Sequence, residues 1–257
     1  MKPAPFEYER PRTLDNALRL LAERGDEAVP LAGGQSLVPM MNLRLARPAT
    51  VVDLNEVPGL DGIAHRDGML VIGAMARQRD VERSPLCARL CPLLASALRH
   101  VGNPQTRNRG TVGGNLAQAD PASELPTVIA ACGGVIVLAS VDGTRELEAD
   151  AFFVRPFTNA RAPGELVVEV RIPALRDDQG WAFDELAPSY TAHAILAVSA
   201  VADAGGVRAA VAGVPGSPRL VSHPDDLANV ADPYQRAAAS DLVRRVSAQA
   251  LERMAAA

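Results

Sequence analysis

The chain has 257 residues, of which 48% are hydrophobic and 22% charged, and its formal net charge is −4 at pH 7. This composition is typical of a folded protein with an aliphatic core, and it argues against disorder. It lacks the basic patch of a nucleic-acid-binding protein, and its apolar stretches fall short of the ~20 residues that span a bilayer. We therefore expect a cytoplasmic protein with no nucleic-acid partner and no membrane span.

The N-terminal part of the sequence predicts a small α/β unit. A helix should begin after Thr13 and end at Gly25, because Leu14, Ala17, Leu18 and Leu21 recur at helical spacing. Short buried strands are expected at residues 28–32 and 50–54. A strand, a helix and a strand in this order favour an α/β arrangement.

The middle of the chain predicts further strands and helices. Strands are expected at 69–75, 134–140 and 165–173, since these runs are apolar and bounded by turn residues. A short arginine-rich helix should follow the first strand, and one longer amphipathic helix should cover residues 86–101. Residues 122–133 predict another helix, with Pro126 in its first turn.

The pattern of apolar and polar residues changes after Pro173. Three apolar or alternating runs, at 180–186, 194–203 and 206–214, predict strands, with a hairpin turn at Gly205–Gly206. The chain should close on a helix from Pro233 to Met254. We expect a domain boundary near residue 175 and, beyond it, a three-stranded sheet plus a helix.

The first candidate site is the sequence AGGQS at Ala32–Ser36, directly after a predicted strand. Two glycines permit a sharp turn and leave no Cβ between a ligand and the amides. Successive N–H groups in such a turn can bind an anion, and Ser36 adds a hydroxyl donor. The ligand class that fits is phosphate, and the alternative is a tight turn without a ligand. The stretch matches neither the P-loop nor the G-x-G-x-x-G fingerprint.

The second candidate site, GTVGGNLAQADPASELP at 110–126, repeats this chemistry, because Gly110, Gly113 and Gly114 free the backbone. Thr111 and Asn115 offer side-chain hydrogen bonds, and Asp120 or Glu124 could accept from ribose hydroxyls. Two glycine-rich loops of this kind could clamp one diphosphate from both sides. We expect Arg107 and Arg109, just upstream, to be exposed or ion-paired.

No set of catalytic or metal-ligating side chains is evident. The four histidines are widely separated, and we expect His193 to be a buried histidine in an apolar strand. Cys87 and Cys91 lie four residues apart, on one face of a predicted helix, and with Cys132 they are too few for an iron–sulfur cluster. A redox cofactor would explain an enzyme without catalytic side chains, because the cofactor carries the chemistry.

Two stretches, AGGQSLVPMMNLRLARP and RNRGTVGGNLAQADPASELP, resemble the signature loops of the FAD-binding medium subunit of molybdenum hydroxylases. That group includes xanthine dehydrogenase and carbon-monoxide dehydrogenase. The C-terminal DLVRRVSAQALERM is similar to the family's closing helix. The resemblance implies an α+β fold with two α/β FAD-binding subdomains of PCMH/VAO type, at 1–57 and 58–174. A C-terminal domain of the carbon-monoxide dehydrogenase flavoprotein type would follow at 175–257.

The resemblance also implies that FAD binds non-covalently, with its diphosphate between the two loops. Glu124 matches an acidic position on the adenosine side, and Leu166 an apolar position near the cofactor. The cofactor-binding residues that follow are Ala32, Gly33, Gly34, Gln35, Ser36, Leu37, Thr111, Val112, Gly113, Gly114, Asn115, Asp120, Glu124 and Leu166.

The partners implied by the resemblance are a small subunit with two [2Fe–2S] clusters and a large subunit with the molybdenum cofactor, as a dimer of heterotrimers. Electrons would pass through the clusters to FAD and then to an external acceptor. The alternative is a self-contained flavin-dependent oxidase or reductase of the same fold. This chain departs from the family at Asn42, where Lys is frequent, and at Glu185, Pro188 and Ser189. The sequence names neither the organic substrate nor the acceptor.

Overall fold

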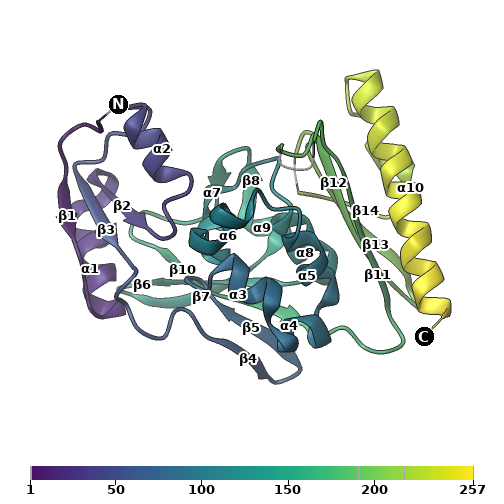
Figure 1. Cartoon of the computed structure of the whole chain (residues 1–257), viewed down its shortest axis with the longest axis horizontal. Coiled ribbons are helices and arrows are strands. Elements are labelled where there is room, and N and C mark those ends of the chain that lie inside the picture. The colour runs from purple at the N-terminus through teal and green to yellow at the C-terminus, as the bar shows by residue number, and fades with distance from the viewer. Residues whose placement is uncertain (1, 190–191, 217, 257) are drawn as a thin grey trace.

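The computed structural model describes residues 2–189, 192–216 and 218–256. The protein is a mixed α and β structure in which three main sheets follow one another along the longest axis of the molecule (Figure 1). A two-stranded ribbon of β8 (Phe153–Arg155) and β9 (Thr158–Asn159) accompanies them. The three sheets occur in the same order as the N-terminal, middle and C-terminal parts predicted from the sequence. The domain boundaries at 57/58 and 174/175 stay a prediction.

The N-terminal sheet is parallel, in the order β1 (Glu7–Glu9), β3 (Thr50–Asp53) and β2 (Ala28–Leu31). The predicted helix is confirmed as α1 (Leu14–Arg24), with a 3₁₀ turn at Gly25–Glu27 after it. The Thr13 hydroxyl accepts a hydrogen bond from the Asn16 amide at 3.2 Å, which caps the first turn. The predicted apolar face is buried against the sheet.

Between β2 and β3 the chain forms a helix that was not predicted, α2 (Leu37–Asn42). Only Met41 of its six residues is buried, so the segment has no amphipathic pattern. This helix begins directly after the glycine pair, and it makes the first candidate loop a strand-to-helix turn.

The central sheet is antiparallel, with strand order β4-β5-β10-β6-β7. The predicted strands are confirmed as β5 (Met69–Gly73), β6 (Val135–Ser140) and β10 (Leu166–Pro173). The edge strands β4 (Ile63–Arg66) and β7 (Gly143–Glu148) were not predicted. Both are largely exposed and carry charged residues, so they lack the apolar run that indicates a buried strand.

Helices pack on the central sheet and on one another. The predicted single helix at 86–101 is wrong: the structure has two helices, separated at Cys91. Pro92 cannot donate a backbone hydrogen bond and disfavours helical geometry in the residue before it, so Cys91 leaves the helix at φ −147° and ψ 71°. The helices are α3 (Gln78–Arg83), α4 (Pro85–Leu90), α5 (Pro92–Leu98), α6 (Pro104–Arg109), α7 (Val112–Gln118), α8 (Leu125–Cys132) and α9 (Ala149–Phe152).

This break places Cys91 against Cys132 instead of on the helix face of Cys87. The two Sγ atoms are 3.9 Å apart, and all three thiols are buried. Burial raises the pKa of Cys87, and the thiol contact with Cys91 and burial together raise the pKa of Cys132. We expect a thiol-specific reagent to modify none of the three in the native protein at pH 8 and all of them after unfolding. A rapidly reacting thiol in the native state would contradict this packing.

The C-terminal sheet is antiparallel and has four strands rather than the three predicted, in the order β11 (Gly180–Leu186), β12 (Leu196–Asp203), β13 (Gly206–Ala212) and β14 (Arg219–Val221). The fourth strand has only three residues within a polar, proline-dotted segment, so the sequence gives little sign of it. The hairpin at Gly205–Gly206 is confirmed, with Asp203 paired to Gly206.

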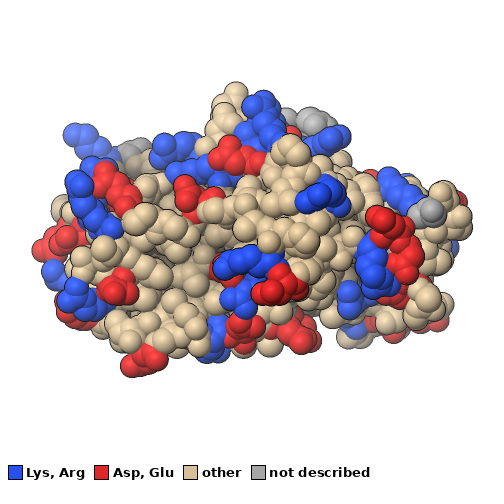
Figure 2. Space-filling model, turned by 90° about the horizontal axis from the view of Figure 1, so that it is seen from below, with Lys and Arg blue, Asp and Glu red and all other residues tan. Residues whose placement is uncertain are grey.

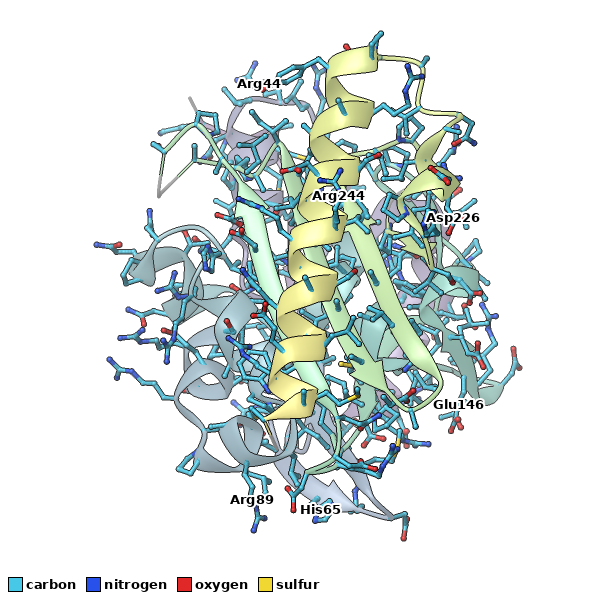
Figure 3. The ribbon with its side chains drawn as sticks, turned by 90° about the vertical axis from the view of Figure 1, so that its right-hand side faces the viewer. Arg44, His65, Arg89, Glu146, Asp226 and Arg244 are labelled. Atoms are coloured by element: carbon cyan, nitrogen blue, oxygen red, sulfur yellow. The ribbon has the colours of Figure 1, made fainter. Side chains whose placement is uncertain are left out.

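Two helices cover the faces of this sheet. The predicted closing helix is confirmed as α10 (Pro233–Ala255), which follows a 3₁₀ turn at Pro224–Leu227 and lies across the outer face, with Arg244 pointing away from the strands (Figure 3). On the inner face α8 packs against β12 and β13. Thr127 of α8 and Ser199 of β12 share a buried hydrogen bond of 2.7 Å. None of the helices in the described ranges is long and apolar enough to cross a membrane.

Candidate functional site

The predicted site residues surround a cavity of about 500 Å3 between the N-terminal sheet and the helices of the central sheet. All but one of them line it, namely Ala32, Gly33, Gly34, Gln35, Ser36, Leu37, Thr111, Gly113, Gly114, Asn115, Asp120, Glu124 and Leu166. Val112 does not: its side chain is 1% exposed and belongs to the core of the central sheet. The structure thus brings together two motifs that lie almost eighty residues apart in the sequence.

The first motif, between β2 and α2, presents free amide groups. The backbone N–H groups of Gly33 to Leu37 form no hydrogen bond within the described residues. The turn depends on Gly34, which has φ +72°, a conformation that glycine adopts readily. The side-chain NH2 group of Asn55 donates to the Ala32 carbonyl oxygen at 3.0 Å and holds the start of the turn. Consecutive free amides at the edge of a cavity form a binding site for an anion.

The second motif is not the open loop predicted from its glycines. Residues 112–118 form helix α7, and the Thr111 hydroxyl accepts a hydrogen bond from the Gly114 amide at 3.0 Å. The amides of Val112 and Gly113 donate to the carbonyl oxygens of Ala76 and Ala74, at 3.0 and 2.8 Å. The amides of Val112 to Asn115 are therefore not free for a diphosphate, contrary to what the glycines suggest, whereas the N–H group of Thr111 has no partner among the described residues. Otherwise this stretch offers a ligand a wall and its side chains.

The glycines also serve a different purpose from the one predicted. A Cβ on Gly33 would lie 2.2 Å from the Arg109 carbonyl oxygen and 2.8 Å from Gly110 Cα. A Cβ on Gly113 would lie 2.4 Å from the Cβ of Ala74. These positions lack a side chain because the two motifs pack directly on each other and on the end of β5, rather than only to admit a ligand.

Polar side chains after α7 complete one wall of the cavity. Ser123 donates to Asn115 Oδ1 at 2.7 Å, which orients the amide of Asn115 and leaves its NH2 group as a donor. Asp120 accepts a hydrogen bond from the Ala122 amide at 2.9 Å. The wall therefore contains both donors and acceptors for a polar ligand.

Glu124 is the buried acid of this wall, with 6% of its surface exposed. Burial raises the pKa of Glu124 to about 7, and the nearby carboxylate of Glu185 adds to the increase. The backbone amide of Glu124 and the imidazole of His100 act in the opposite direction. Near neutral pH this carboxyl group is therefore divided between its protonated and ionised forms.

Three cavity residues were missed by the sequence analysis. Gln78, at the start of α3, is 3% exposed, and its Oε1 is buried with no hydrogen-bond partner in the described chain. Arg161 donates to Asn159 and to the Glu165 carbonyl oxygen, both at 3.1 Å, and burial lowers its pKa. His193 is exposed at the cavity and lies outside any strand, so its prediction as a buried strand histidine is wrong. None of the three belongs to a glycine-rich motif.

The arginines before the second motif differ from each other. Arg107 is 5% exposed, so it is not a surface residue. Its guanidinium binds the Glu82 carboxylate at 2.9 Å and the carbonyl oxygens of Val101 and Gly102 at 3.0 and 3.2 Å. Because Val101 and Gly102 line the cavity, this ion pair supports the cavity wall. Arg109 is exposed, as predicted.

Comparison with known proteins gives consistent matches. The model of the family described as FAD binding domain in molybdopterin dehydrogenase matches residues 4–175. The 6-hydroxypseudooxynicotine dehydrogenase complex subunit alpha of Paenarthrobacter nicotinovorans is 43% identical over 195 residues, which is 76% of this chain and 66% of the relative. The carbon monoxide dehydrogenase medium chain of Hydrogenophaga pseudoflava is 40% identical over 186 residues, 72% of this chain and 65% of the relative. The aligned parts span just under two thirds of the length of both relatives.

The structure has a close match as well. A solved structure of carbon monoxide dehydrogenase from Hydrogenophaga pseudoflava, which lacks the Mo-pyranopterin moiety of the molybdenum cofactor, superposes with a TM-score of 0.92. The superposition covers 98% of this chain and 99% of that chain, at 32% sequence identity. The similarity therefore extends through the C-terminal sheet and α10, beyond the part matched by the family model.

Proposed function

Since this chain belongs to the family of the FAD-binding domain in molybdopterin dehydrogenase, we propose that it is the FAD-binding electron-transfer subunit of a cytoplasmic molybdenum hydroxylase. It accepts electrons from [2Fe–2S] clusters in a small partner subunit and passes them to an external acceptor. A large partner subunit carries the molybdenum cofactor and binds the organic substrate, and the complex is a dimer of heterotrimers. The chain itself is an oxidoreductase subunit, and FAD supplies its redox chemistry.

The residues of the cavity fit FAD. A volume of about 500 Å3 lies within the range of about 300–1,000 Å3 that ligand pockets occupy. The free amides from Gly33 to Leu37 can hold a diphosphate, and Gln78, which lines the cavity, has a buried Oε1 without a partner among the described residues. The row of free amides is the observation that carries the proposal most directly. Gly33 is buried and Gly34 and Leu37 are half-buried, and an N–H group without a partner is costly in such places.

Each side of the cavity has its own proposed task. The turn from Ala32 to Leu37 binds the diphosphate, and Thr111, Gly113 and Gly114 form the opposite wall. Val112 anchors that wall in the core. Asn115, Asp120 and Glu124 contact the polar parts of the nucleotide, and Leu166 provides an apolar surface. Arg161 is the only arginine or lysine among the described residues that line the cavity, and it adds positive charge for an anionic ligand.

The test is to purify the chain, alone and with the partners encoded beside it, and to measure flavin content by absorbance. We expect about one non-covalently bound FAD per chain, and bleaching of the flavin by substrate only when all three subunits are present. Turnover of a small organic substrate by the isolated chain would instead support the self-contained oxidase or reductase. A chain that binds no FAD at any concentration would contradict both functions.

A further inference from the structure

A cluster of titratable groups lies where α8 begins, behind the cavity wall formed by Glu124. Glu185, on β11, has a side chain only 7% exposed, and its Oε2 makes no hydrogen bond among the described residues. His100, which follows α5, places Nδ1 3.1 Å from Glu185 Oε1, and its ring packs on Phe183 with centroids 5.0 Å apart. This cluster joins the cavity to the C-terminal sheet.

The charges around Glu124 give its ionised form little support. The hydrogen bond with Glu185 raises the pKa of His100, and the Nδ1 of His100 faces Glu185 Oε1. Asp120, in the loop before α8, adds a negative charge on the cavity side. Glu124 therefore has a second carboxylate as neighbour and no arginine or lysine bound to it within the described residues.

The other charged groups near this cluster are occupied elsewhere. Asp184, the neighbour of Glu185, pairs with Arg245 of α10 at 2.8 Å. Arg208 of β13 reaches the opposite end of α8, where it donates to the Ala131 carbonyl oxygen at 2.6 Å. The hydroxyl of Thr127 donates to the backbone carbonyl oxygen of Glu124, not to its carboxyl group. Arg161 and His193 line the same cavity, and Arg161 offsets part of the negative charge that a diphosphate brings. The remaining negative charge disfavours a carboxylate at Glu124.

We propose that Glu124 enters the FAD complex as a neutral carboxylic acid that donates a hydrogen bond to the cofactor, so that FAD binding above neutral pH places one proton on the Glu124 carboxylate. This inference rests on the proposed function. It differs from the role expected from the sequence, in which Asp120 or Glu124 accepts a hydrogen bond from ribose hydroxyls. The proton comes from solvent, and the exposed side of the cluster is His100, with a side chain 32% exposed.

The first test measures the dissociation constant of FAD for the full chain between pH 6 and pH 8, by quenching of flavin fluorescence. With the pKa of Glu124 at about 7, binding of the protonated form alone makes the affinity about tenfold weaker at pH 8 than at pH 6. Calorimetry at pH 8 in two buffers of different protonation enthalpy should show nearly one proton taken up per FAD. Equal affinity at both pH values would overturn the inference alone, whereas no FAD binding at any pH would overturn the proposed function with it.

Two variants separate Glu124 from the other acid of the cavity. Glu124→Gln keeps a neutral hydrogen-bond donor, so the pH dependence and the proton uptake should both disappear. Asp120→Asn removes an acid that raises the pKa of Glu124 and contacts the nucleotide, so it should weaken FAD binding but retain both effects, with the change in affinity moved to lower pH. If Glu124→Gln kept the tenfold change, another group would be responsible and the inference would fail.

A stability measurement needs no FAD. A carboxyl group whose pKa is raised from 4.5 to about 7 favours the folded state below pH 4.5, and this contribution is lost as the pH rises through 7. Glu124→Gln should therefore raise the Tm relative to the wild type at pH 8.5 and not at pH 5. A lower Tm of the variant at pH 8.5 would show that the folded protein stabilises the ionised carboxylate, against the inference.

Discussion

Replacing Gly33 with alanine is expected to weaken FAD binding by up to roughly a hundredfold. The new Cβ would lie 2.2 Å from the Arg109 carbonyl oxygen and 2.8 Å from Gly110 Cα, and both of these atoms belong to backbone that cannot rotate away. The turn and the α6–α7 connection must separate, which displaces the free amides from the wall opposite. Overpacking of this kind costs about 1–3 kcal/mol. If the strain is present in the FAD complex and relieved in the FAD-free protein, a cost of about 3 kcal/mol corresponds to roughly a hundredfold loss of FAD affinity.

The measurement is a fluorescence titration of the apoprotein with FAD, together with the Tm of each variant. Gly62→Ala is the matched control, because a Cβ at Gly62 meets no atom within 4 Å. We expect Gly62→Ala to bind FAD as the wild type does. Full FAD binding by Gly33→Ala would show that the two motifs do not need to touch, and would contradict the site described above.

The main elements of the fold could be predicted where local signals agree with burial. The helix after Thr13 has a cap, an apolar face and a glycine stop, and it appears with those limits. Strands β6 and β10 were predicted because each is an apolar run buried in the central sheet. Charged edge strands such as β7, and the three-residue β14, carry no such pattern, because most of their residues are not buried, although each pairs with the strand just before it in the chain.

The site was predicted in position but not in mechanism. Glycine-rich composition correctly indicated two stretches that meet at one cavity. It could not distinguish a glycine that frees an amide from one that allows two segments to touch, as at Gly113. Gln78 and Arg161 reach the cavity from elements whose sequences are ordinary, so only the tertiary arrangement identifies them. Figure 2 shows acidic and basic side chains intermixed over one face of the molecule.

Replacing Arg107 with alanine should produce the largest loss of stability among single substitutions of charged residues near the cavity. Arg107 is 5% exposed, and it binds Glu82 and the carbonyl oxygens of Val101 and Gly102. Removing one partner of a buried pair costs about 3–5 kcal/mol. Glu82 keeps Arg79 at 2.9 Å as a second partner, so we expect the lower half of this range. This corresponds to a fall in Tm of roughly 10 °C for a protein of this size.

Arg89→Ala is the control for this substitution, because Arg89 is exposed and projects from the periphery of the molecule (Figure 3). It should change the free energy of unfolding by no more than about 0.5 kcal/mol. FAD affinity should also fall in Arg107→Ala, since Val101 and Gly102 line the cavity, but not in Arg89→Ala. Equal Tm values for the two variants would contradict a supporting role for Arg107.

The pH dependence of the Arg107→Ala effect tests its electrostatic part. Burial by itself would raise the pKa of Glu82, but the hydrogen bonds from Arg79 and Arg107 outweigh it, so the pKa of Glu82 lies below its usual value of 4.5. The pair therefore stabilises the folded state above pH 4.5, and this contribution disappears as the pH falls through the lowered pKa. The difference in Tm between wild type and Arg107→Ala should be largest near pH 7 and should narrow in acid. A difference that stays constant down to pH 3 would mean that Arg107 acts only through packing and the two carbonyl groups.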